Sequence, residues 1–316
     1  MTARRINPFA RLENPFEPAP ALNCRHKRCG CHVPIDHAFQ QYERFRKMLS
    51  FLGDFQEKGL FVVVSGPSGT GKTSLINRCA SLTKRTLAGR GMPTEILDLT
   101  GAGGGSRVLI DDRTRKVGNE LISKLRSNQH LLDGGLPAEL MPVDGYPDLD
   151  EVTRRVAEHL RPNAVVIATT PAAEHDQVEQ VEKYLVGAQQ RFLIFAESTA
   201  LKLPQKITHS WKTAGGVYRL YLETGFLKPG DGMTFGRART GNPGKSGTFP
   251  DLKLEDLERF TGGGNMPISF LQTILYKIYD SYVTDPSLCG NIVTVTDLER
   301  AIEAVSRDEG EVGRSS

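Results

Sequence analysis

The segment that most constrains the fold of this chain is an octapeptide, Gly-Pro-Ser-Gly-Thr-Gly-Lys-Thr, that runs from Gly66 to Thr73. It fits the pattern GxxxxGK[ST] in full, follows the apolar run LFVVVS (Leu60 to Ser65) and opens the helix-forming stretch SLINRCASL. Such glycines let backbone N–H groups surround a phosphate, and the following helix adds its positive end to the same oxygens. The motif therefore predicts a phosphate-binding loop between a buried strand and a helix.

The polar residues of this loop have expected roles in binding a nucleotide. Lys72 is expected to bridge the β- and γ-phosphates of ATP, and the Thr73 hydroxyl is expected to ligate Mg²⁺. Ser74, one residue into the helix, is expected to reach the side of the α-phosphate. The predicted nucleotide-binding residues of the loop are Gly66, Pro67, Ser68, Gly69, Thr70, Gly71, Lys72, Thr73 and Ser74.

Short apolar runs alternate with helical patterns over most of the chain. Runs of this kind without polar alternation are typical of strands that are covered on both faces of a parallel sheet. The predicted strands are Leu60 to Ser65, Thr94 to Leu99, Ala164 to Thr169, Arg191 to Glu197 and Val217 to Leu222. The predicted helices between them are Thr73 to Ala88, Lys116 to Arg126, Leu149 to Leu160 and Asp176 to Ala188. The fold class is therefore α/β, a five-stranded parallel P-loop sheet with flanking helices.

The character of the sequence changes at several points, and these points predict the domain boundaries. Residues 1–35 are rich in Pro, Arg, Asn and Cys without periodicity, so they are predicted to form an irregular arm. An amphipathic pattern begins at Asp36, and residues 36–228 are predicted to form the ATPase core. After a Gly-rich segment only helical patterns follow, which predicts a small all-helical lid domain over residues 229–306 and a disordered tail over 307–316.

Composition narrows the function classes. With 39% hydrophobic and 24% charged residues the chain is neither fibrous nor wholly disordered. A formal charge of +3 is too small for a nucleic-acid coat protein, so any DNA binding would depend on a local patch. The sequence contains neither an apolar run of membrane-spanning length nor a signal-peptide segment at its start, so we expect a cytoplasmic protein with no membrane partner.

The acids that normally accompany a P-loop are hard to place. A P-loop ATPase carries acids at the end of a neighbouring strand, where they hold Mg²⁺ through water and polarise the attacking water. The third predicted strand instead ends in Ala168 and Thr169. The fourth ends in Glu197, at the sheet edge where ligands bind in this architecture. We therefore predict Lys72 and Glu197 as the catalytic residues.

Other assignments of these polar groups stay open. Ser198 and Thr199 follow Glu197 and could contact the γ-phosphate, or the whole group could be a strand-end polar cluster without a role. Asp111 and Asp112 in VLIDD offer another pair of acids. That segment follows the second strand too closely for a parallel crossover, which favours a surface loop there.

The order of the predicted strands, P-loop and helical lid resembles that of the AAA+ ATPases. The similar branch is that of origin-recognition and Cdc6-like proteins, transposition-helper ATPases and STAND ATPases. The resemblance covers roughly Asn14 to Ala304. NPFEP (Asn14 to Pro18) resembles the lead-in that runs beside the adenine, and YLETGFLKPGDGMTFGRAR resembles the turn and helix that lead to the lid. GGGNMPISFLQTIL resembles the Gly-Gly-x-Pro turn of the lid, which implies that Pro267 lines the nucleotide base.

The departures from this family pattern also carry implications. The third strand lacks the Walker B acids, and Met266, Pro267 and Ile268 stand where many AAA+ proteins place a sensor 2 arginine. The resemblance then implies slow hydrolysis or a nucleotide switch that turns over rarely. Arg237 and Arg239 could act on the nucleotide of a neighbouring subunit, or they could belong to a solvated basic loop.

The leading functional hypothesis is an ATP-binding, slowly ATP-hydrolysing AAA+ molecular switch that uses Mg²⁺, forms homo-oligomers and acts on a protein partner or DNA. The alternative is a nucleotide-binding scaffold that has lost hydrolysis with its Walker B acids. A P-loop kinase is less favoured, because the helical lid and the strand order count against it and the sequence shows no acceptor-site arginine cluster.

A cluster of thiols and imidazoles lies in the predicted arm. Cys24, Cys29 and Cys31 together with His26 offer four ligands for Zn²⁺. The spacing is not that of a usual zinc finger, and the adjacent Cys31 and His32 cannot easily bind one ion together. The interleaved basic residues permit a flexible arm that contacts phosphate or an acidic partner, and an arm without a specific role is the third interpretation.

Overall fold

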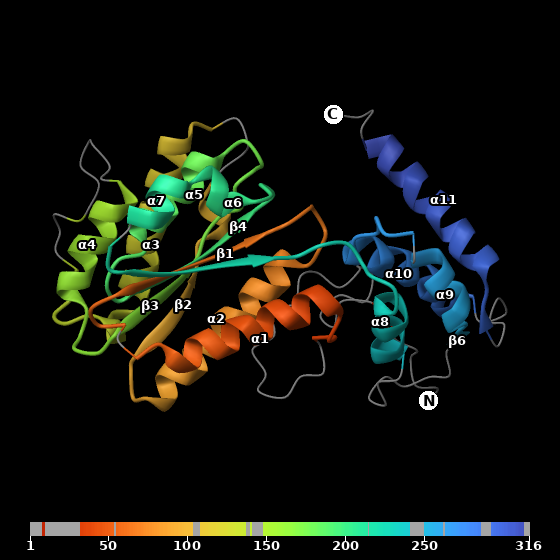
Figure 1. Cartoon of the computed structure of the whole chain (residues 1–316), viewed down its shortest axis with the longest axis horizontal. Coiled ribbons are helices and arrows are strands. Elements are labelled where there is room, and N and C mark those ends of the chain that lie inside the picture. The colour runs from red at the N-terminus through yellow and green to blue at the C-terminus, as the bar shows by residue number, and fades with distance from the viewer. Residues whose placement is uncertain are drawn as a thin grey trace.

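The structure is a computed structural model, and it describes residues 8–9, 32–53, 55–103, 108–136, 140, 148–213, 215–240, 250–261, 263–285 and 292–312. These residues form an α/β core and a smaller lid beside it (Figure 1). The core contains a five-stranded sheet of order β2-β3-β4-β1-β5 in which every pair is parallel. Its strands are β1 (Gly59–Ser65), β2 (Thr94–Asp98), β3 (Val165–Thr169), β4 (Phe192–Ser198) and β5 (Val217–Glu223). The predicted parallel P-loop sheet is confirmed.

Helices cover both faces of the sheet because its strands bury apolar side chains on both sides. In β1 every residue is buried, with Leu60, Val62 and Val64 in one apolar cluster and Phe61 and Val63 in the other. The helices on the first face are α1 (Asp36–Phe51) and α2 (Lys72–Gly89). The helices on the second face are α3 (Ile110–Ser127), α4 (Leu149–His159), α5 (Val178–Gly187) and the short helices α6 (Leu203–Lys206) and α7 (Thr208–Thr213). Single turns of 3₁₀-helix lie at Thr100–Gly103 and Gln129–Leu131.

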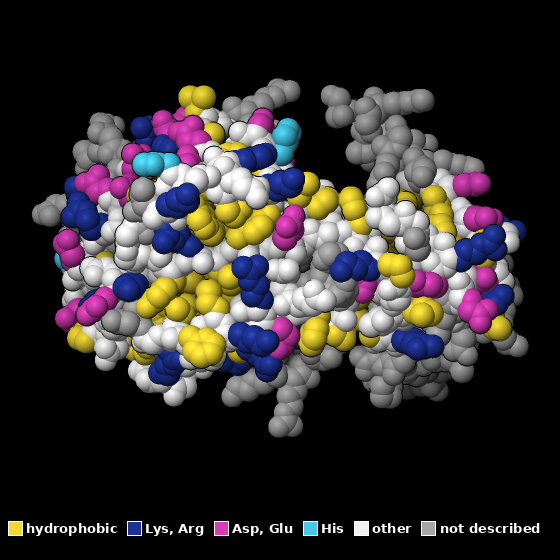
Figure 2. Space-filling view, viewed as in Figure 1, with side chains coloured by type: hydrophobic (Ala, Val, Ile, Leu, Met, Phe, Trp, Pro, Cys, Tyr) yellow, Lys and Arg dark blue, Asp and Glu magenta, His cyan; other side chains and the backbone are white. Residues whose placement is uncertain are grey.

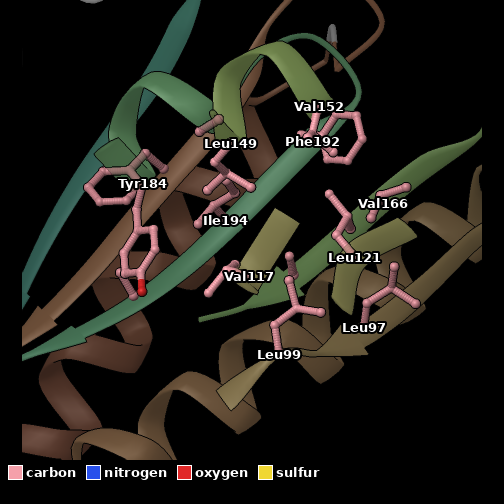
Figure 3. Close-up of a cluster of buried hydrophobic side chains, with 14 of the residues drawn as sticks. Leu97, Leu99, Val117, Leu121, Leu149, Val152, Val166, Tyr184, Phe192 and Ile194 are labelled. Carbon is pink, nitrogen blue, oxygen red and sulfur yellow. The ribbon is translucent and has the colours of Figure 1, made fainter. Parts of the chain in front are cut away.

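The cluster under α3, α4 and α5 fixes these helices on the sheet. In Figure 3 side chains from the three helices point toward those of β2, β3 and β4, with Leu121 near Val166 and Leu149 near Ile194. All four of these side chains are essentially inaccessible to solvent. Burial of a residue of this kind contributes about 1.5–3 kcal/mol relative to an exposed one. The strand ends that carry the polar groups are therefore held by a rigid core.

The lid is built from helices α8 (Asp231–Thr240), α9 (Leu254–Thr261), α10 (Ile268–Thr284) and α11 (Val295–Val312). It also contains a two-residue parallel strand pair, β6 (Asp251–Leu252) with β7 (Ile292–Val293), which the sequence did not predict. Helix α8 lies in the segment that was predicted as Gly-rich and whose resemblance implied a turn and a helix leading to the lid. A Cβ on Gly236 would come within 2.8 Å of Leu252, so this glycine lets α8 pack closely on its neighbour. Helix α11 continues past Val305 into the segment predicted as a tail.

The segment VLIDD does not form a strand. Helix α3 begins at Ile110, so Asp111 and Asp112 lie in its first turn, where carboxylates interact favourably with the positive end of the helix. Asp111 also accepts a hydrogen bond from Lys183 of α5. Neither acid therefore lies at a strand end, and the alternative that one of them binds Mg²⁺ is wrong. Over the part of the chain that the structure describes, no helix is long and apolar enough to cross a membrane.

We predict that Gly59→Ala destabilises the core, because β1 starts in close contact with the loop after α5. The added Cβ would lie 2.0 Å from the Ala188 carbonyl oxygen, so the central strand must shift. We expect a loss of about 1–3 kcal/mol in the free energy of unfolding, measured by chemical denaturation. Gly89→Ala at the end of α2 is the control, since nothing lies within 4 Å of its added Cβ. Equal stability of the two variants would contradict this description of the packing.

Candidate functional site

The octapeptide forms a tight loop between β1 and α2. Gly69 and Gly71 have φ angles of +73° and +88°, a region that side chains with a Cβ rarely adopt. A Cβ on Gly69 would also lie 2.1 Å from the Ser269 hydroxyl oxygen of the lid. The backbone N–H of Ser269 donates to the Gly69 carbonyl at 3.0 Å, so lid and loop touch directly. The glycines thus serve both the curvature of the loop and the approach of the lid.

The end of β5 supports this loop from one side. The Thr70 and Thr224 hydroxyl oxygens lie 2.7 Å apart, and Thr70 also donates to the Pro67 carbonyl at 2.8 Å. The Thr224 backbone N–H donates to the Ser65 carbonyl at 2.8 Å. Thr224 was not among the residues predicted from the sequence. The feature that could have pointed to it is its position directly after β5, the strand that pairs with β1.

Lys72, the first residue of α2, has a buried side chain. Its Nζ donates to the Pro67 carbonyl at 2.8 Å and lies 3.6 Å from Glu197 Oε1. Burial lowers the pKa of Lys72, and the Glu197 carboxylate opposes that effect because it favours the charged ammonium. The loop therefore holds a partly desolvated cation at its centre.

Glu197 also contacts the next residue of the loop. The Thr73 hydroxyl donates to Glu197 Oε2 at 2.6 Å, so one carboxylate binds both the lysine and the threonine of the motif. This contact follows from topology, because β4 lies beside β1 with Val64 opposite Glu197. The structure thus brings together Lys72, Thr73 and Glu197, the residues for which the sequence predicted catalytic and metal-binding roles.

A second acid, which sequence reasoning missed, lies at the same edge of the sheet. After β3 the chain runs beside the end of β4, since the Ala173 N–H donates to the Glu197 carbonyl at 2.8 Å and the Thr199 N–H donates to the Ala173 carbonyl at 3.1 Å. Glu174 follows directly, and its negative charge raises the pKa of Lys72. The available signal was that Glu174 is the first acid after the third strand.

The two hydroxyls after Glu197 differ in their surroundings. Ser198 is fully buried, and its hydroxyl oxygen accepts the Ala200 N–H at 3.0 Å. It stabilises the turn after β4, which favours a structural role for Ser198 over the alternative of a contact with the γ-phosphate. The Thr199 hydroxyl oxygen is buried and has no hydrogen-bond partner among the described residues. It remains a polar group at the carboxyl edge of the sheet that a ligand could satisfy.

A pocket of about 230 Å³ extends from the loop toward the lid. Residues 69–75 of the loop and of α2 form one end, together with Glu197. The rest of the wall comes from the segment before α1, from α1 and α2, and from lid helices α8 and α10. Its residues are His32, Val33, Ile35, Ala38, Arg78, Phe235, Arg239, Ile268, Ser269 and Gln272. The pocket therefore lies between the core and the lid.

Pro267, which the lid turn implied would line the nucleotide base, is not among the residues that line this pocket, and its contact with a base stays a prediction. It is the N-cap of α10, and its ring carbon Cβ would lie 3.3 Å from a Cβ placed on Gly69. The next residue, Ile268, lines the pocket instead. The difference arises because the first turn of α10, rather than the turn before it, faces the pocket.

The two arginines of α8 lie on a helix, so the basic-loop interpretation is wrong. Arg237 is exposed, whereas Arg239 lines the pocket of its own chain with its guanidinium 5.4 Å from the Phe235 ring centroid. His32 lines the same pocket, and its pKa is lowered to about 4, first by burial and then by the cations Arg78 and Arg239. The His32 imidazole is therefore neutral at pH 7.

The predicted zinc ligands Cys24, His26, Cys29 and Cys31 lie outside the described residues, as does the NPFEP segment from Asn14 to Pro18. Within the described ranges, no group of three or more His, Cys, Asp or Glu side chains is arranged to hold a metal. The thiol of Cys79 lies in the core under α2, and burial raises its pKa.

Comparisons with known proteins rest on structure. No protein-family model matches the sequence, and no curated protein matches it. The Aeropyrum pernix ORC2 protein (ADPNP-ADP complexes) superposes with a TM-score of 0.55 and 10% identity, over 89% of this chain and 70% of that chain. The A. pernix ORC1 protein in complex with DNA gives 0.56 and 12%, over 87% and 68%. Cdc6p from Pyrobaculum aerophilum gives 0.51 and 13%, over 81% and 65%.

The chain shares the fold of these origin-recognition and Cdc6 proteins. This finding confirms the resemblance that the order of strands, loop and lid suggested. Since the identities are between 10% and 13%, the likeness concerns the fold alone.

We predict that Glu197→Gln destabilises the ligand-free protein, because the buried Lys72 ammonium loses its counter-charge. The expected loss is about 1–3 kcal/mol in the free energy of unfolding, measured by chemical denaturation. Glu95→Gln is the matched control, since Glu95 pairs with the partly exposed Lys84 at 2.5 Å. An exposed pair contributes about 0–1 kcal/mol. If the two substitutions cost the same, Glu197 does not stabilise the buried cation.

Proposed function

We propose that this chain binds ATP with Mg²⁺ in the pocket between core and lid and acts as a slowly hydrolysing molecular switch. The observation that carries the proposal is the contact of one carboxylate, Glu197, with both Lys72 and Thr73. An ammonium and a hydroxyl that share a carboxylate at a helix N-terminus form a site with separate places for an anion and a divalent cation.

The residues present fit both groups. Cβ atoms on Gly66 and Gly69 would collide with Thr224 and Ser269, so glycine is needed for the tight curvature of the loop. Lys72 supplies a cation for phosphate oxygens. The Thr73 hydroxyl and the Glu197 carboxylate supply the oxygen ligands that Mg²⁺ prefers. Bound Mg²⁺ would neutralise charge on the phosphates. The phosphate-binding residues in this proposal are Gly66, Pro67, Ser68, Gly69, Thr70, Gly71, Lys72, Thr73 and Ser74.

Slow hydrolysis follows from where the acids lie. Strand β3 ends in Thr169 without an acid, although Asp98 at the end of β2 and Glu223 at the end of β5 lie at the same edge of the sheet. The acids whose charge acts on Lys72 are Glu197 on β4 and Glu174 in the segment after β3. Because Glu197 contacts Lys72 and Thr73, we assign it to Mg²⁺ and to holding the loop. We then assign Glu174 to orienting a water molecule, from an exposed position in a loop rather than from a strand.

The partners form the less direct part of the proposal. Among proteins with this fold, the A. pernix ORC2 protein was solved as ADPNP-ADP complexes and the ORC1 protein in complex with DNA. The first observation supports nucleotide binding and the second supports DNA as a partner. Assembly with further copies and action on a protein partner are parts of the proposal that rest on the resemblance in the order of parts. A scaffold that binds nucleotide without turnover is the alternative, and the lack of an acid on β3 favours it over other classes.

We predict that Lys72→Ala weakens ATP binding by a factor of about 10 or more, because a charged hydrogen-bonding group at the phosphates is lost. Isothermal titration calorimetry with Mg²⁺-ATP measures the effect. Lys84→Ala is the control on the same helix, since Lys84 pairs with Glu95 away from the pocket. Unchanged affinity in Lys72→Ala, or an equal loss in Lys84→Ala, would contradict the proposed site.

We predict an intrinsic turnover below about 1 s⁻¹, the low end for phosphoryl-transfer enzymes with well-placed catalytic groups. Glu174→Gln should reduce hydrolysis further while ATP affinity is retained, and Glu197→Gln should reduce both Mg²⁺-dependent binding and hydrolysis. Phosphate release under saturating ATP measures the rates. Glu179→Gln on the exposed face of α5 is the control. Hydrolysis that is unaffected by both glutamate substitutions would exclude these assignments, and no hydrolysis in the wild type would favour the scaffold.

A further inference from the structure

We propose that Gln272 selects adenine at the far end of the pocket, and that the backbone carbonyl of Phe9 fixes the orientation in which it does so. This inference rests on the proposed function, because it names the base of the nucleotide bound there. The juxtaposition that carries it is a buried glutamine that lines the pocket and is tied to the arm at the N-terminal end of the chain.

Phe9 is firmly placed in the lid. Its side chain is fully buried, with ring centroids 5.2 Å from Tyr279 and 6.1 Å from Phe235. Its carbonyl oxygen accepts a hydrogen bond from Gln272 Nε2 at 2.6 Å. The aromatic contacts therefore hold the carbonyl against α10, and the carbonyl holds the amide of Gln272.

This bond removes the usual ambiguity of a glutamine side chain. A backbone carbonyl can only accept, so the amide nitrogen of Gln272 must face Phe9 and Oε1 must lie on the other side of the amide group. Among the described residues none donates a hydrogen bond to Oε1, yet that atom is not sealed from solvent. Gln272 is only 8% exposed and lines the pocket, so the pocket is where this acceptor is accessible.

The position of Gln272 along α10 places it at the base end. Ser269, in the first turn, contacts Gly69 of the loop, and a Cβ on Gly71 would lie 3.7 Å from Ile268. Gln272 lies on the same face of α10 one turn further along, which is about 5 Å along the helix axis in the direction away from the end that contacts the loop. Phe235 and Val33, two apolar side chains, line the pocket with it. A purine with its phosphates at the loop fits this apolar end.

The fixed amide discriminates between bases by hydrogen-bond polarity. Adenine carries an exocyclic amine, which donates, where guanine and hypoxanthine carry a carbonyl oxygen, which accepts. A freely rotating glutamine can turn its amide to suit either group. Here a flip of the Gln272 amide would break its hydrogen bond to Phe9 and would place Oε1 against the Phe9 carbonyl oxygen, which is unfavourable. Gln272 Oε1 therefore stays available to accept a hydrogen bond from a ligand. The nearby cations Arg78 and Arg239 carry only donors and do not supply this acceptor.

The test compares ATP with ITP, whose hypoxanthine base has a carbonyl oxygen in place of the amine. Dissociation constants of both nucleotides with Mg²⁺ are measured by calorimetry for the wild type, Gln272→Leu, Phe9→Ala and the control Thr273→Ala. Among the described residues, the Thr273 hydroxyl bonds only to the Ser269 carbonyl of its own helix, so its loss should not affect the pocket. Thermal melts establish that each variant is folded. If Phe9→Ala is destabilised, the ratio of dissociation constants in Gln272→Leu still tests the inference.

We expect the wild type and Thr273→Ala to prefer ATP over ITP about tenfold, the contribution of one hydrogen bond and of avoided repulsion. Gln272→Leu should bring the ratio close to one, and Phe9→Ala should lower it. Equal binding of ATP and ITP by the wild type, or an unchanged ratio in Gln272→Leu, would overturn the inference while leaving the nucleotide site in place. Failure of the wild type to bind either nucleotide would overturn the proposed function itself.

Discussion

The bidentate contact of Glu197 with Lys72 and Thr73 is the interaction on which the rest of the site depends. It brings a buried ammonium, a hydroxyl and a carboxylate within 3.6 Å at the start of α2. Without the carboxylate, the partly desolvated ammonium would keep a hydrogen bond to the Pro67 carbonyl but would lose its nearest counter-charge. We propose that Lys72 binds an anion and that Thr73 and Glu197 bind a divalent cation beside it. The residues that hold the ligand-free loop together are therefore also the proposed ligand-binding residues.

The strand order explains why this contact exists. Since β4 lies between β3 and β1, the acid that reaches the loop comes from the strand directly beside it. The lid completes the site from the other side, through the contact of Ser269 with Gly69 and through the wall formed by α8 and α10. The Phe9 carbonyl then fixes Gln272 in that wall, so a residue near the N-terminal end of the chain contributes to the pocket.

Sequence patterns predict much of this architecture, because buried strands and the P-loop leave strong local signals. The five strands are predictable because each is an apolar run. The place of Glu197 beside the P-loop is predictable because the carboxyl ends of parallel strands meet at one edge of the sheet. Features set by tertiary contacts were not predictable. Helix α8 contains glycines that serve close packing, and Glu174 reaches the sheet edge only because the chain turns back beside β4 after β3. Ile268 replaces Pro267 in the pocket because of the direction in which α10 begins.

A crystal structure of the protein with Mg²⁺ and a non-hydrolysable ATP analogue tests the central claim most directly. The account predicts phosphate oxygens at Lys72 Nζ and at the backbone N–H groups of the loop, with Mg²⁺ beside the Thr73 hydroxyl and Glu197 released from its contact with Lys72. An analogue bound elsewhere on the chain, or an empty pocket with Glu197 still paired to Lys72 at saturating concentration, would contradict it.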